Sequence, residues 1–315
     1  MTAAPWIGPA GQRMRRLELH VTYTCPERCV FCSEEHRMRD FHPYPVTLGR
    51  VVRILREHAE RGVEAVHLTG GEPTVHPEFH DILRVAKALG MRTSMGTIGT
   101  GLANASFAER AMPLLDDVLF SLHGPDAATH DALTRRPGSF DKLVRAVENS
   151  RRKPGFRPSF NTVLTRHNLA RLPDTAALVA ELGGGLLIVS NTTPEGAGED
   201  AYADLTVRLA DIRAIAPEVV RRAGDTIVRF FGTPLCALPD VRMHSNDLHW
   251  DPRVTVEWAA HPGKVSMDDV YSWTPERKRT YVGACDACRF KGLCAGVFAK
   301  YVELYGDAEL EALRE

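Results

Sequence analysis

Strand-like and helix-like segments alternate along most of this chain, and this alternation limits the possible folds more than any other feature. Amphipathic stretches separate the strands, for example 47–61, which begins at Thr47, and 77–89, which ends before Gly90. The strand-like runs are residues 17–24, 64–69, 92–98, 117–123, 157–165 and 186–191. Repeated strand and helix units predict a parallel α/β sheet or barrel, with an active site at the carboxyl ends of the strands.

Three cysteines, Cys25, Cys29 and Cys32, follow the first strand-like run with the spacing C-x3-C-x2-C. Four thiolates saturate a [4Fe–4S] cluster, whereas three thiolates leave one iron open to a small molecule. The incomplete ligand set therefore predicts a reactive cluster. The alternative is a zinc site completed by His20 or His36, although zinc ligands usually come as C-x2-C pairs.

The triplet, with the aromatic residue Phe31 before its last cysteine, resembles the signature of the radical S-adenosylmethionine (SAM) superfamily. The resemblance implies that SAM chelates the open iron through its amino and carboxylate groups. Reduction of the cluster would cleave SAM to methionine and a 5′-deoxyadenosyl radical, which would abstract a hydrogen from the substrate. Phe31 would supply an apolar wall beside the cofactor.

A second motif, Gly70-Gly71-Glu72-Pro73, ends the second strand-like run. Glycines let the backbone approach a ligand closely, and a glutamate accepts hydrogen bonds from an ammonium group. Taken alone, this sequence is an ordinary turn. Together with the cysteine triplet it matches the superfamily's motif for the SAM amino group, which implies that Gly70, Gly71 and Glu72 contact SAM and that Pro73 fixes the turn.

Polar residues in the later strands are weaker candidates for the site. Period-two alternation predicts that Ser121 and His123 share one face of the fourth strand. Many members of the superfamily carry an acidic residue where His123 stands. We expect Ser121 and Asn161 to contact SAM, and His123 and Asn191 to contact the substrate. The alternative is that each is an ordinary polar group paired with a neighbouring strand.

Four more cysteines, Cys236, Cys285, Cys288 and Cys294, lie beyond the predicted barrel. Four thiolates can close a second [4Fe–4S] cluster with no cysteine left over. The last three, spaced C-x2-C-x5-C, resemble the auxiliary-cluster segments of SPASM and twitch type, twitch-like in cysteine number and SPASM-like in spacing. A zinc site on the same four sulfurs is the alternative.

These patterns divide the chain into three parts. Residues 1–16 form a lead-in, and 17–224 form a partial (βα)6 barrel of the kind typical of the superfamily. Residues 225–315 form a small SPASM/twitch-like module that is expected to be partly irregular and organised by its metal. Within this module, 296–306 has the apolar spacing of a helix that packs against the barrel.

Composition limits the class of protein and its partners. The 315 residues contain 44% hydrophobic and 25% charged side chains, with a formal net charge of −1. A soluble globular protein is expected, without the basic field that would favour nucleic acid. The chain has no apolar stretch long enough for a membrane span and no apolar signal core, so we expect a cytoplasmic protein without a membrane partner.

The resemblance favours a radical SAM oxidoreductase or maturase that modifies a peptide or natural product, supplied with electrons by an external one-electron reductant such as flavodoxin or ferredoxin. No spare cysteine remains to quench a substrate radical. This favours net oxidation over epimerisation. The first alternative is a small-molecule dehydrogenase or epimerase acting on a sugar, antibiotic or cofactor precursor. The second is a non-enzymatic iron–sulfur redox carrier.

Overall fold

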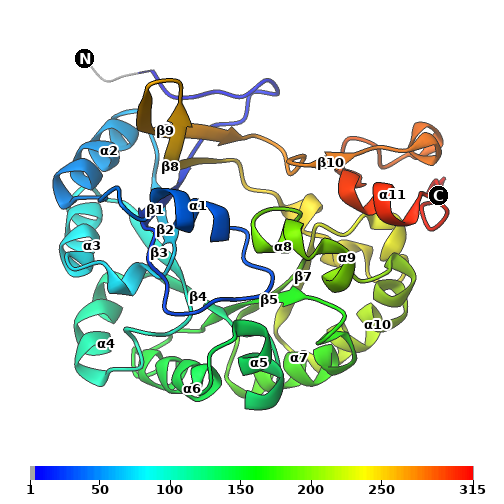
Figure 1. The fold of residues 1–315 in the computed structure, drawn as a ribbon, viewed down its shortest axis with the longest axis horizontal. Helices are drawn as coiled ribbons and strands as arrows, with labels where there is room; N and C mark the ends of the chain where they lie inside the picture. Colours follow the sequence, from blue (N-terminus) through cyan, green and yellow to red (C-terminus); the bar gives the residue numbers. More distant parts are fainter. Residues whose placement is uncertain (1–3, 315) are drawn as a thin grey trace.

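One curved sheet of nine strands forms the centre of the molecule, with helices along its outer side (Figure 1). The computed structural model describes residues 4–314. The strands of the large sheet are β1 (Arg16–Thr22), β2 (Ala65–Gly70), β3 (Arg92–Thr97), β4 (Asp117–Ser121), β5 (Ser159–Leu164), β6 (Leu186–Asn191), β7 (Ile227–Phe231), β8 (Arg253–His261) and β9 (Lys264–Ser272). A second, two-stranded sheet pairs β10 (Arg279–Thr280) with β11 (Val297–Phe298).

Helices occupy most of the connections between the strands of the large sheet. The α-helices are α1 (Glu35–Phe41), α2 (Leu48–Glu60), α3 (Phe79–Ala88), α4 (Ala105–Ala111), α5 (Ala127–Thr134), α6 (Ser139–Ser150), α7 (Leu172–Glu181), α8 (Ala197–Asp200), α9 (Tyr202–Leu205), α10 (Leu209–Arg222) and α11 (Ala299–Tyr305). Short 3-10 turns include η1 (Pro73–Val75), η4 (Leu235–Ala237), η6 (Asn246–His249) and η7 (Gly283–Ala287).

The order of the strands makes the sheet an open barrel. β1 to β7 lie side by side in chain order, and each pair is parallel. β8 joins the other side of β1 in parallel, and β9 pairs antiparallel with β8. Since β7 and β9 are the two edges, the sheet does not close on itself. This confirms the predicted partial barrel, and a strand overlaps each of the six predicted strand-like runs.

Alternation along the strands separates the apolar core from a polar inner face. Leu17, Leu19 and Val21 of β1 have no exposed surface and belong to the core under the helices. Glu18 and His20 point to the opposite face, because successive side chains of a strand alternate. The concave side of the sheet is therefore the side on which polar chemistry is possible.

The outer helices follow the pattern expected of amphipathic helices. In α2 the buried side chains are Val51, Ile54, Leu55 and His58, which recur at helical spacing. The Thr47 hydroxyl accepts a hydrogen bond from the Arg50 amide, which confirms the predicted N-cap. α2 thus covers the sheet with one apolar stripe.

The β8–β9 hairpin is a feature that the strand prediction missed. Its first strand alternates buried Val254, Val256 and Trp258 with polar residues, and the turn contains Gly263 with positive φ. Alternation followed by such a turn is a hairpin signal. The hairpin extends the barrel sheet at β1, so residues far apart in the sequence become neighbours of the first cysteine loop.

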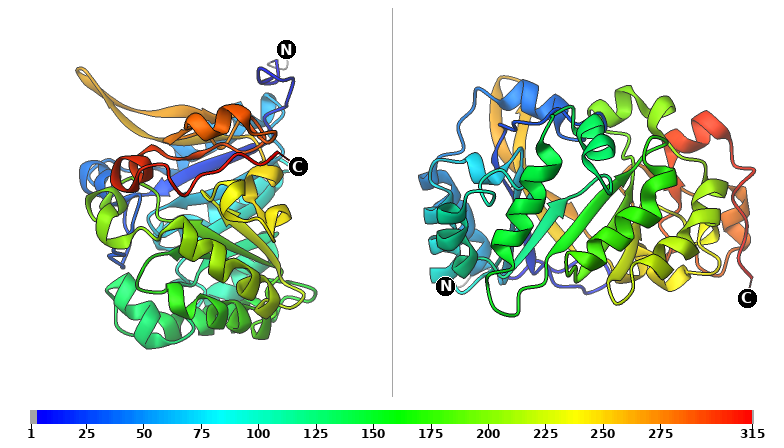
Figure 2. Two further views of the ribbon diagram at one scale, coloured as in Figure 1. Left: turned by 90° about the vertical axis from the view of Figure 1, so that its right-hand side faces the viewer. Right: turned by 90° about the horizontal axis from the view of Figure 1, so that it is seen from below.

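The chain after residue 224 contributes to the same sheet through β7, β8 and β9, and the sheet shows no break there. The division into a barrel of residues 17–224 and a C-terminal module of residues 225–315 stays a prediction. α11 lies within the predicted helical stretch and packs beside α10 (Figure 2). The Leu209 amide donates a hydrogen bond to the Tyr301 hydroxyl at 2.9 Å.

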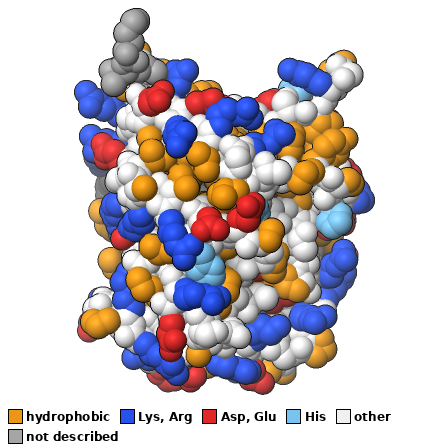
Figure 3. Space-filling view, turned by 90° about the vertical axis from the view of Figure 1, so that its left-hand side faces the viewer, with side chains coloured by type: hydrophobic (Ala, Val, Ile, Leu, Met, Phe, Trp, Pro, Cys, Tyr) orange, Lys and Arg blue, Asp and Glu red, His pale blue; other side chains and the backbone are white. Residues whose placement is uncertain are grey.

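The outer surface around α2 and α3 carries positive, negative and hydrophobic side chains interspersed with one another (Figure 3). This mixture agrees with the small net charge of −1. Among residues 4–314, none of the helices combines the length and apolar character needed to cross a membrane.

Candidate metal centres

The first three cysteines lie on one loop that leaves the carboxyl end of β1 and leads to α1. Cys25, Cys29 and Cys32 line a single cavity of about 1130 Å³. The loop is fixed to α5, because the Val30 amide donates a hydrogen bond to the Leu133 carbonyl at 2.9 Å. The fold therefore brings the predicted cysteines together at the end of the barrel where active sites are found.

The electrostatics of this loop fit a bound cation. Burial raises the pKa of Cys25 to about 12 and that of Cys32 to about 11, and it raises the pKa of Cys29 well above its usual range. Neighbouring thiolate charges add to the effect at Cys25 and Cys29. Three gathered thiolates are thus costly unless a metal compensates them, and an all-sulfur donor set suits iron. The residues present fit a three-thiolate cluster.

Gly70 and Gly71 hold the start of the cysteine loop by close backbone contact. A Cβ on Gly70 would lie 2.3 Å from the Thr22 carbonyl oxygen, and a Cβ on Gly71 would lie 2.2 Å from the Thr24 carbonyl oxygen. The Gly71 amide donates to Thr22 and the Glu72 amide donates to Thr24, both at 2.8 Å. Only glycine fits between the end of β2 and this loop.

The Glu72 carboxylate has a different position from the one expected. It is fully buried, and Oε1 accepts hydrogen bonds from Thr97 Oγ1 at 2.7 Å and from the amide and hydroxyl of Thr74. Oε2 accepts from the Ile98 amide at 2.8 Å. Burial raises the pKa of Glu72. Oε1 thus braces the turn at Pro73 and Oε2 ties it to the loop after β3, while the contact of Glu72 with SAM stays a prediction.

Phe31 and His123 pack against each other beneath the loop. Their ring centroids are 4.6 Å apart in an edge-to-face arrangement, and Phe31 also belongs to a small apolar cluster with Leu133 and Leu205. His123 lies beyond the end of β4, and its Nδ1 accepts a hydrogen bond from the Val163 amide at 3.2 Å. Burial lowers the pKa of His123, which is therefore neutral. These contacts hold the cysteine loop in place. The predicted contacts of Phe31 with SAM and of His123 with the substrate stay predictions.

Asn161 and Asn191 have side-chain partners within the protein, and Ser121 lies beside Asn161. Ser121 pairs in register with Asn161 on the inner face, and Asn161 Oδ1 accepts a hydrogen bond from Ser190 Oγ at 2.7 Å. Asn191 Nδ2 donates to the Gly232 carbonyl at 3.0 Å. This last contact fixes the loop that leads to Cys236, and a substrate contact for Asn191 stays a prediction. A SAM contact for Ser121 and Asn161 stays a prediction.

The other four cysteines line a second, small cavity. Cys236 follows β7 in η4, whereas Cys285, Cys288 and Cys294 come from the irregular segment around η7. Burial raises the pKa of Cys236 and of Cys294, and neighbouring thiolates raise that of Cys236 further. The structure therefore gathers all four predicted ligands, and their sulfur-only donor set fits an iron–sulfur cluster or zinc.

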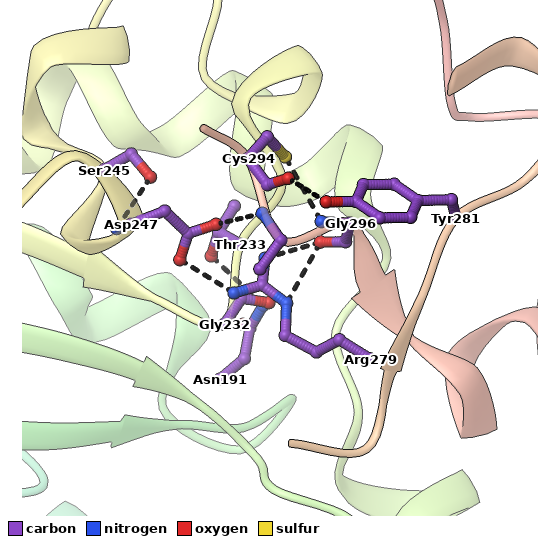
Figure 4. Close-up of polar contacts among 10 residues, drawn as sticks. Asn191, Gly232, Thr233, Ser245, Asp247, Arg279, Tyr281, Cys294 and Gly296 are labelled. Atoms are coloured by element: carbon purple, nitrogen blue, oxygen red, sulfur yellow. Dashed lines mark hydrogen bonds and ion pairs between the residues drawn. The ribbon is translucent and has the colours of Figure 1, made fainter. Parts of the chain in front are cut away.

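A buried ion pair fixes the last of these cysteines (Figure 4). Arg279 Nη1 lies 2.7 Å from Asp247 Oδ1, and neither side chain has more than 1% of its surface exposed. Asp247 Oδ2 accepts a hydrogen bond from the Ala295 amide at 3.0 Å, and Arg279 Nε donates to the Gly296 carbonyl at 3.1 Å. The pair thus grips the backbone immediately after Cys294.

Neither this ion pair nor the turn that holds Cys32 could be predicted from the sequence. The Ala197 amide donates a hydrogen bond to the Cys32 carbonyl at 2.9 Å, so the chain after β6 supports the first cysteine loop. The only sequence signal was the turn-forming run that ends at Gly196. Nothing in the sequence pairs Asp247 with Arg279, which are 32 residues apart.

An open parallel barrel with a three-cysteine loop after its first strand defines a class of protein that holds an incompletely ligated iron–sulfur cluster at the end of a barrel. The sequence profile of the Radical SAM superfamily matches residues 19–179. The chain therefore belongs to the radical SAM superfamily.

Individual relatives are similar over part of the chain. The chain is 33% identical to the mycofactocin maturase MftC of Mycobacterium tuberculosis over 189 residues, which are 60% of this chain and 47% of that protein. It is 29% identical to the PqqA peptide cyclase of Xanthomonas campestris pv. campestris over 219 residues, 69% of this chain and 58% of the cyclase. The chain thus spans about half the length of these relatives.

Solved structures share the fold at low sequence identity. Streptococcus suis SuiB bound to S-adenosylmethionine superposes with a TM-score of 0.62 at 17% identity, covering 95% of this chain and 76% of SuiB. Native anSMEcpe with bound AdoMet and Cp18Cys peptide gives 0.63 at 15% identity, covering 95% of this chain and 92% of that one. The shared architecture extends beyond the barrel into the C-terminal segment.

Proposed function

We propose that this chain is a radical SAM enzyme that cleaves SAM reductively at a [4Fe–4S] cluster held by Cys25, Cys29 and Cys32 and oxidises a peptide substrate. The observation that carries the proposal is the position of these three thiols, which line one cavity at the carboxyl end of an open barrel. The cluster and SAM supply the electron transfer and the 5′-deoxyadenosyl radical.

The protein's own part in this reaction is to hold and shield the reactants. Gly70 and Gly71 bring the end of β2 against the cysteine loop, and Ala197 fixes the loop from the opposite side of the barrel. Phe31 and His123 close the space beneath it with packed rings. A rigid, largely dry support of this kind keeps reactants in place and keeps water from a reactive intermediate.

A peptide is the substrate that the relatives favour. The two similar enzymes are named a mycofactocin maturase and a PqqA peptide cyclase, and SuiB has been solved bound to a precursor peptide. The cavity of about 1130 Å³ at the first cysteines offers room for a segment of a chain molecule. We therefore assign this protein a peptide substrate and net oxidation of that substrate.

The second set of cysteines would hold an auxiliary [4Fe–4S] cluster. Four thiols line one cavity, so such a cluster would be fully ligated by protein. Its role is to accept an electron after hydrogen abstraction, and an external one-electron reductant supplies the first cluster. Zinc at this position would support the fold but could not accept an electron.

Replacement of Cys25, Cys29 and Cys32 together by alanine tests the assignment. After anaerobic reconstitution with iron, sulfide, SAM and a strong reductant, we expect 5′-deoxyadenosine formation to disappear while iron–sulfur absorbance from the second set persists. A Cys288→Ala variant should retain uncoupled SAM cleavage and lose substrate turnover. Mass spectrometry of 5′-deoxyadenosine measures the first result, and cleavage retained by the triple variant would refute the proposal.

A further inference from the structure

A buried cluster of charged residues lies on the inner face of the sheet, where β1 and β8 meet the start of α1. Arg37 Nη1 lies 3.2 Å from Glu34 Oε1, and Arg37 Nη2 lies 3.0 Å from Glu257 Oε1. One guanidinium group therefore binds one oxygen of each carboxylate. This arrangement fixes both carboxylates and leaves their second oxygens free.

The two remaining oxygens face the imidazole of His20. His20 Nδ1 lies 3.5 Å from Glu34 Oε2, and Nε2 lies 3.7 Å from Glu257 Oε2. His20 is only 4% exposed, yet its Nδ1 and Glu34 Oε2 have no hydrogen-bond partner. One ligand atom from each of His20, Glu34 and Glu257 lies within 4.8 Å of the other two. Unsatisfied buried acceptors that converge in this way call for a donor between them.

The charges of the cluster select the kind of donor. Two carboxylates and one guanidinium leave one negative charge, and His20 is neutral because burial lowers its pKa to about 4. The neighbouring Arg277 forms its own ion pair with Glu195 at 2.8 Å and leaves the balance unchanged. A monovalent cation therefore neutralises the cluster, whereas a divalent metal would leave an excess positive charge.

We propose that His20, Glu34 and Glu257 bind a primary ammonium group of the substrate, with Arg37 as the residue that positions the two carboxylates. An ammonium has three N–H donors and no acceptor, which matches one imidazole nitrogen and two carboxylate oxygens. The inference rests on the proposed function and adds to it that the substrate carries a free amine, either a lysine side chain or an amino terminus.

The position of the cluster suits this role. Glu34 follows Cys32 by two residues, so a group bound there lies beside the loop of the first cysteines. The side chains of Glu34 and Arg37 each keep 21% of their surface exposed, so one side of the cluster reaches the protein surface. An amine held at this point would anchor the substrate next to the reacting centre.

Binding to the anaerobically reconstituted, full-length protein tests the inference by calorimetry. The amine ligands are Nα-acetyl-lysine methylamide, with a side-chain amine, and alanine methylamide, with a terminal amine. Nα-acetyl-norleucine methylamide is the neutral match of the first. We expect one amine ligand to bind about tenfold or more tightly than the norleucine compound, and the tighter of the two identifies the source of the amine. Equal binding, or no binding at the solubility limit, would overturn the inference.

Matched variants assign the binding to these residues. Glu34→Gln and Glu257→Gln should each weaken amine binding by about tenfold or more. Glu218→Gln should leave it unchanged, because Glu218 forms the same i,i+3 pair with an arginine on the outer surface. Circular dichroism checks that each variant folds. If one of these variants does not fold, the amine inference is still tested by the affinities of the lysine and norleucine compounds for the unaltered protein.

Two further results separate the competing explanations. Mn²⁺ prefers carboxylate and imidazole to thiolate. Stoichiometric Mn²⁺ binding that is lost in His20→Gln would assign a metal site and overturn the amine assignment.

SAM cleavage, measured as 5′-deoxyadenosine without substrate, should not depend on this cluster. A failure of amine binding with intact SAM cleavage would therefore count against the amine site alone, not against the radical SAM function.

Discussion

The two sets of cysteines are held in place in different ways. The loop of Cys25, Cys29 and Cys32 continues directly from β1 and contacts the end of β2 through backbone atoms. The segment of Cys285 and Cys288 contains little regular structure beyond the turn η7 and the short pair β10–β11. The first set is fixed by the sheet, and the second is fixed by a few side-chain contacts.

This difference indicates which changes each region tolerates. A loop that continues from a sheet is sensitive to backbone spacing, because any added atom pushes the strands and the loop apart. A segment held by a buried ion pair is sensitive to the loss of one partner, which leaves the other charge buried and unpaired. We expect a metal in each region to offset the gathered thiolates.

The largest effect is expected for Arg279→Met, in the second region. Removal of this guanidinium leaves the Asp247 carboxylate buried without its partner, which costs about 3–5 kcal/mol. The chain after Cys294 should loosen, and the iron bound by the second cysteines should be lost while SAM cleavage at the first set continues. Iron analysis and limited proteolysis measure both results.

A surface ion pair provides the control for Arg279. Lys300→Met removes an exposed pair with Glu303 on α11, and such pairs contribute less than about 1 kcal/mol. This variant should keep its iron. Normal iron content in Arg279→Met would mean that the metal, not the ion pair, organises the second region.

The next largest effect is expected for Gly71→Ala, in the first region. The added Cβ would lie 2.2 Å from the Thr24 carbonyl oxygen, with backbone on both sides of the contact. Overpacking of this kind costs about 1–3 kcal/mol. Iron bound by Cys25, Cys29 and Cys32 should fall, while the second set keeps its iron. Urea unfolding and iron analysis check the two effects.

Gly49→Ala is the matched control, because nothing lies within 4 Å of a Cβ at this position of α2. Alanine is the better helix former by about 1 kcal/mol, so this variant should be as stable as the original or slightly more stable. A Gly71→Ala protein that behaves like Gly49→Ala would contradict the close contact between β2 and the cysteine loop.

The strands and the first cysteine site could be predicted from the sequence because their signals are local. Apolar alternation marks β1 to β6, and Cys25, Cys29 and Cys32 lie within eight residues of one another. The same local order made Gly70 and Gly71 recognisable as positions of close approach, although the partner turned out to be the loop at Thr22 and Thr24 in this structure.

Contacts between distant segments could not be predicted in the same way. The carboxylate of Glu72 was expected to face a ligand, but residues of β3 and the loop after it occupy both of its oxygens. Burial of His123 depends on how Phe31 folds back over the end of β4. Such positions follow from packing, and one sequence without its fold does not contain that information.

Acid should destabilise the barrel sheet to which the first cysteine loop is attached, because β2 contains a buried neutral histidine. Burial lowers the pKa of His67 from 6.5 to about 3. Between these two values the unfolded chain binds a proton at this histidine and the folded protein does not. The stabilisation is fully present above about pH 6.5 and is lost as the pH falls toward 3. His67→Asn should therefore remove about 1 kcal/mol of the stability loss between pH 6.5 and about pH 5.5.

Urea unfolding at the two pH values measures this difference. His249→Asn is the control, because His249 is exposed and lies far along the chain from β2. Its stability should depend on pH as the original protein's does. An unchanged pH dependence in His67→Asn would show that this histidine does not distinguish the first region.

The smallest effect is expected for Lys278, which connects the two regions. Lys278 Nζ donates a hydrogen bond to the Pro194 carbonyl at 2.6 Å, close to the turn that holds Cys32, and its neighbour Arg279 grips the backbone after Cys294. Its backbone φ is +57°, a left-handed value that costs a side chain about 1 kcal/mol. Lys278→Met loses the hydrogen bond and keeps the strain, so it should be less stable by about 1 kcal/mol. Lys278→Gly loses both and should stay close to the original in urea unfolding. Equal stability of the two variants would mean that the backbone at position 278 is not strained. Loss of iron from either cysteine set in one of these variants would mean that the two regions are coupled through Lys278.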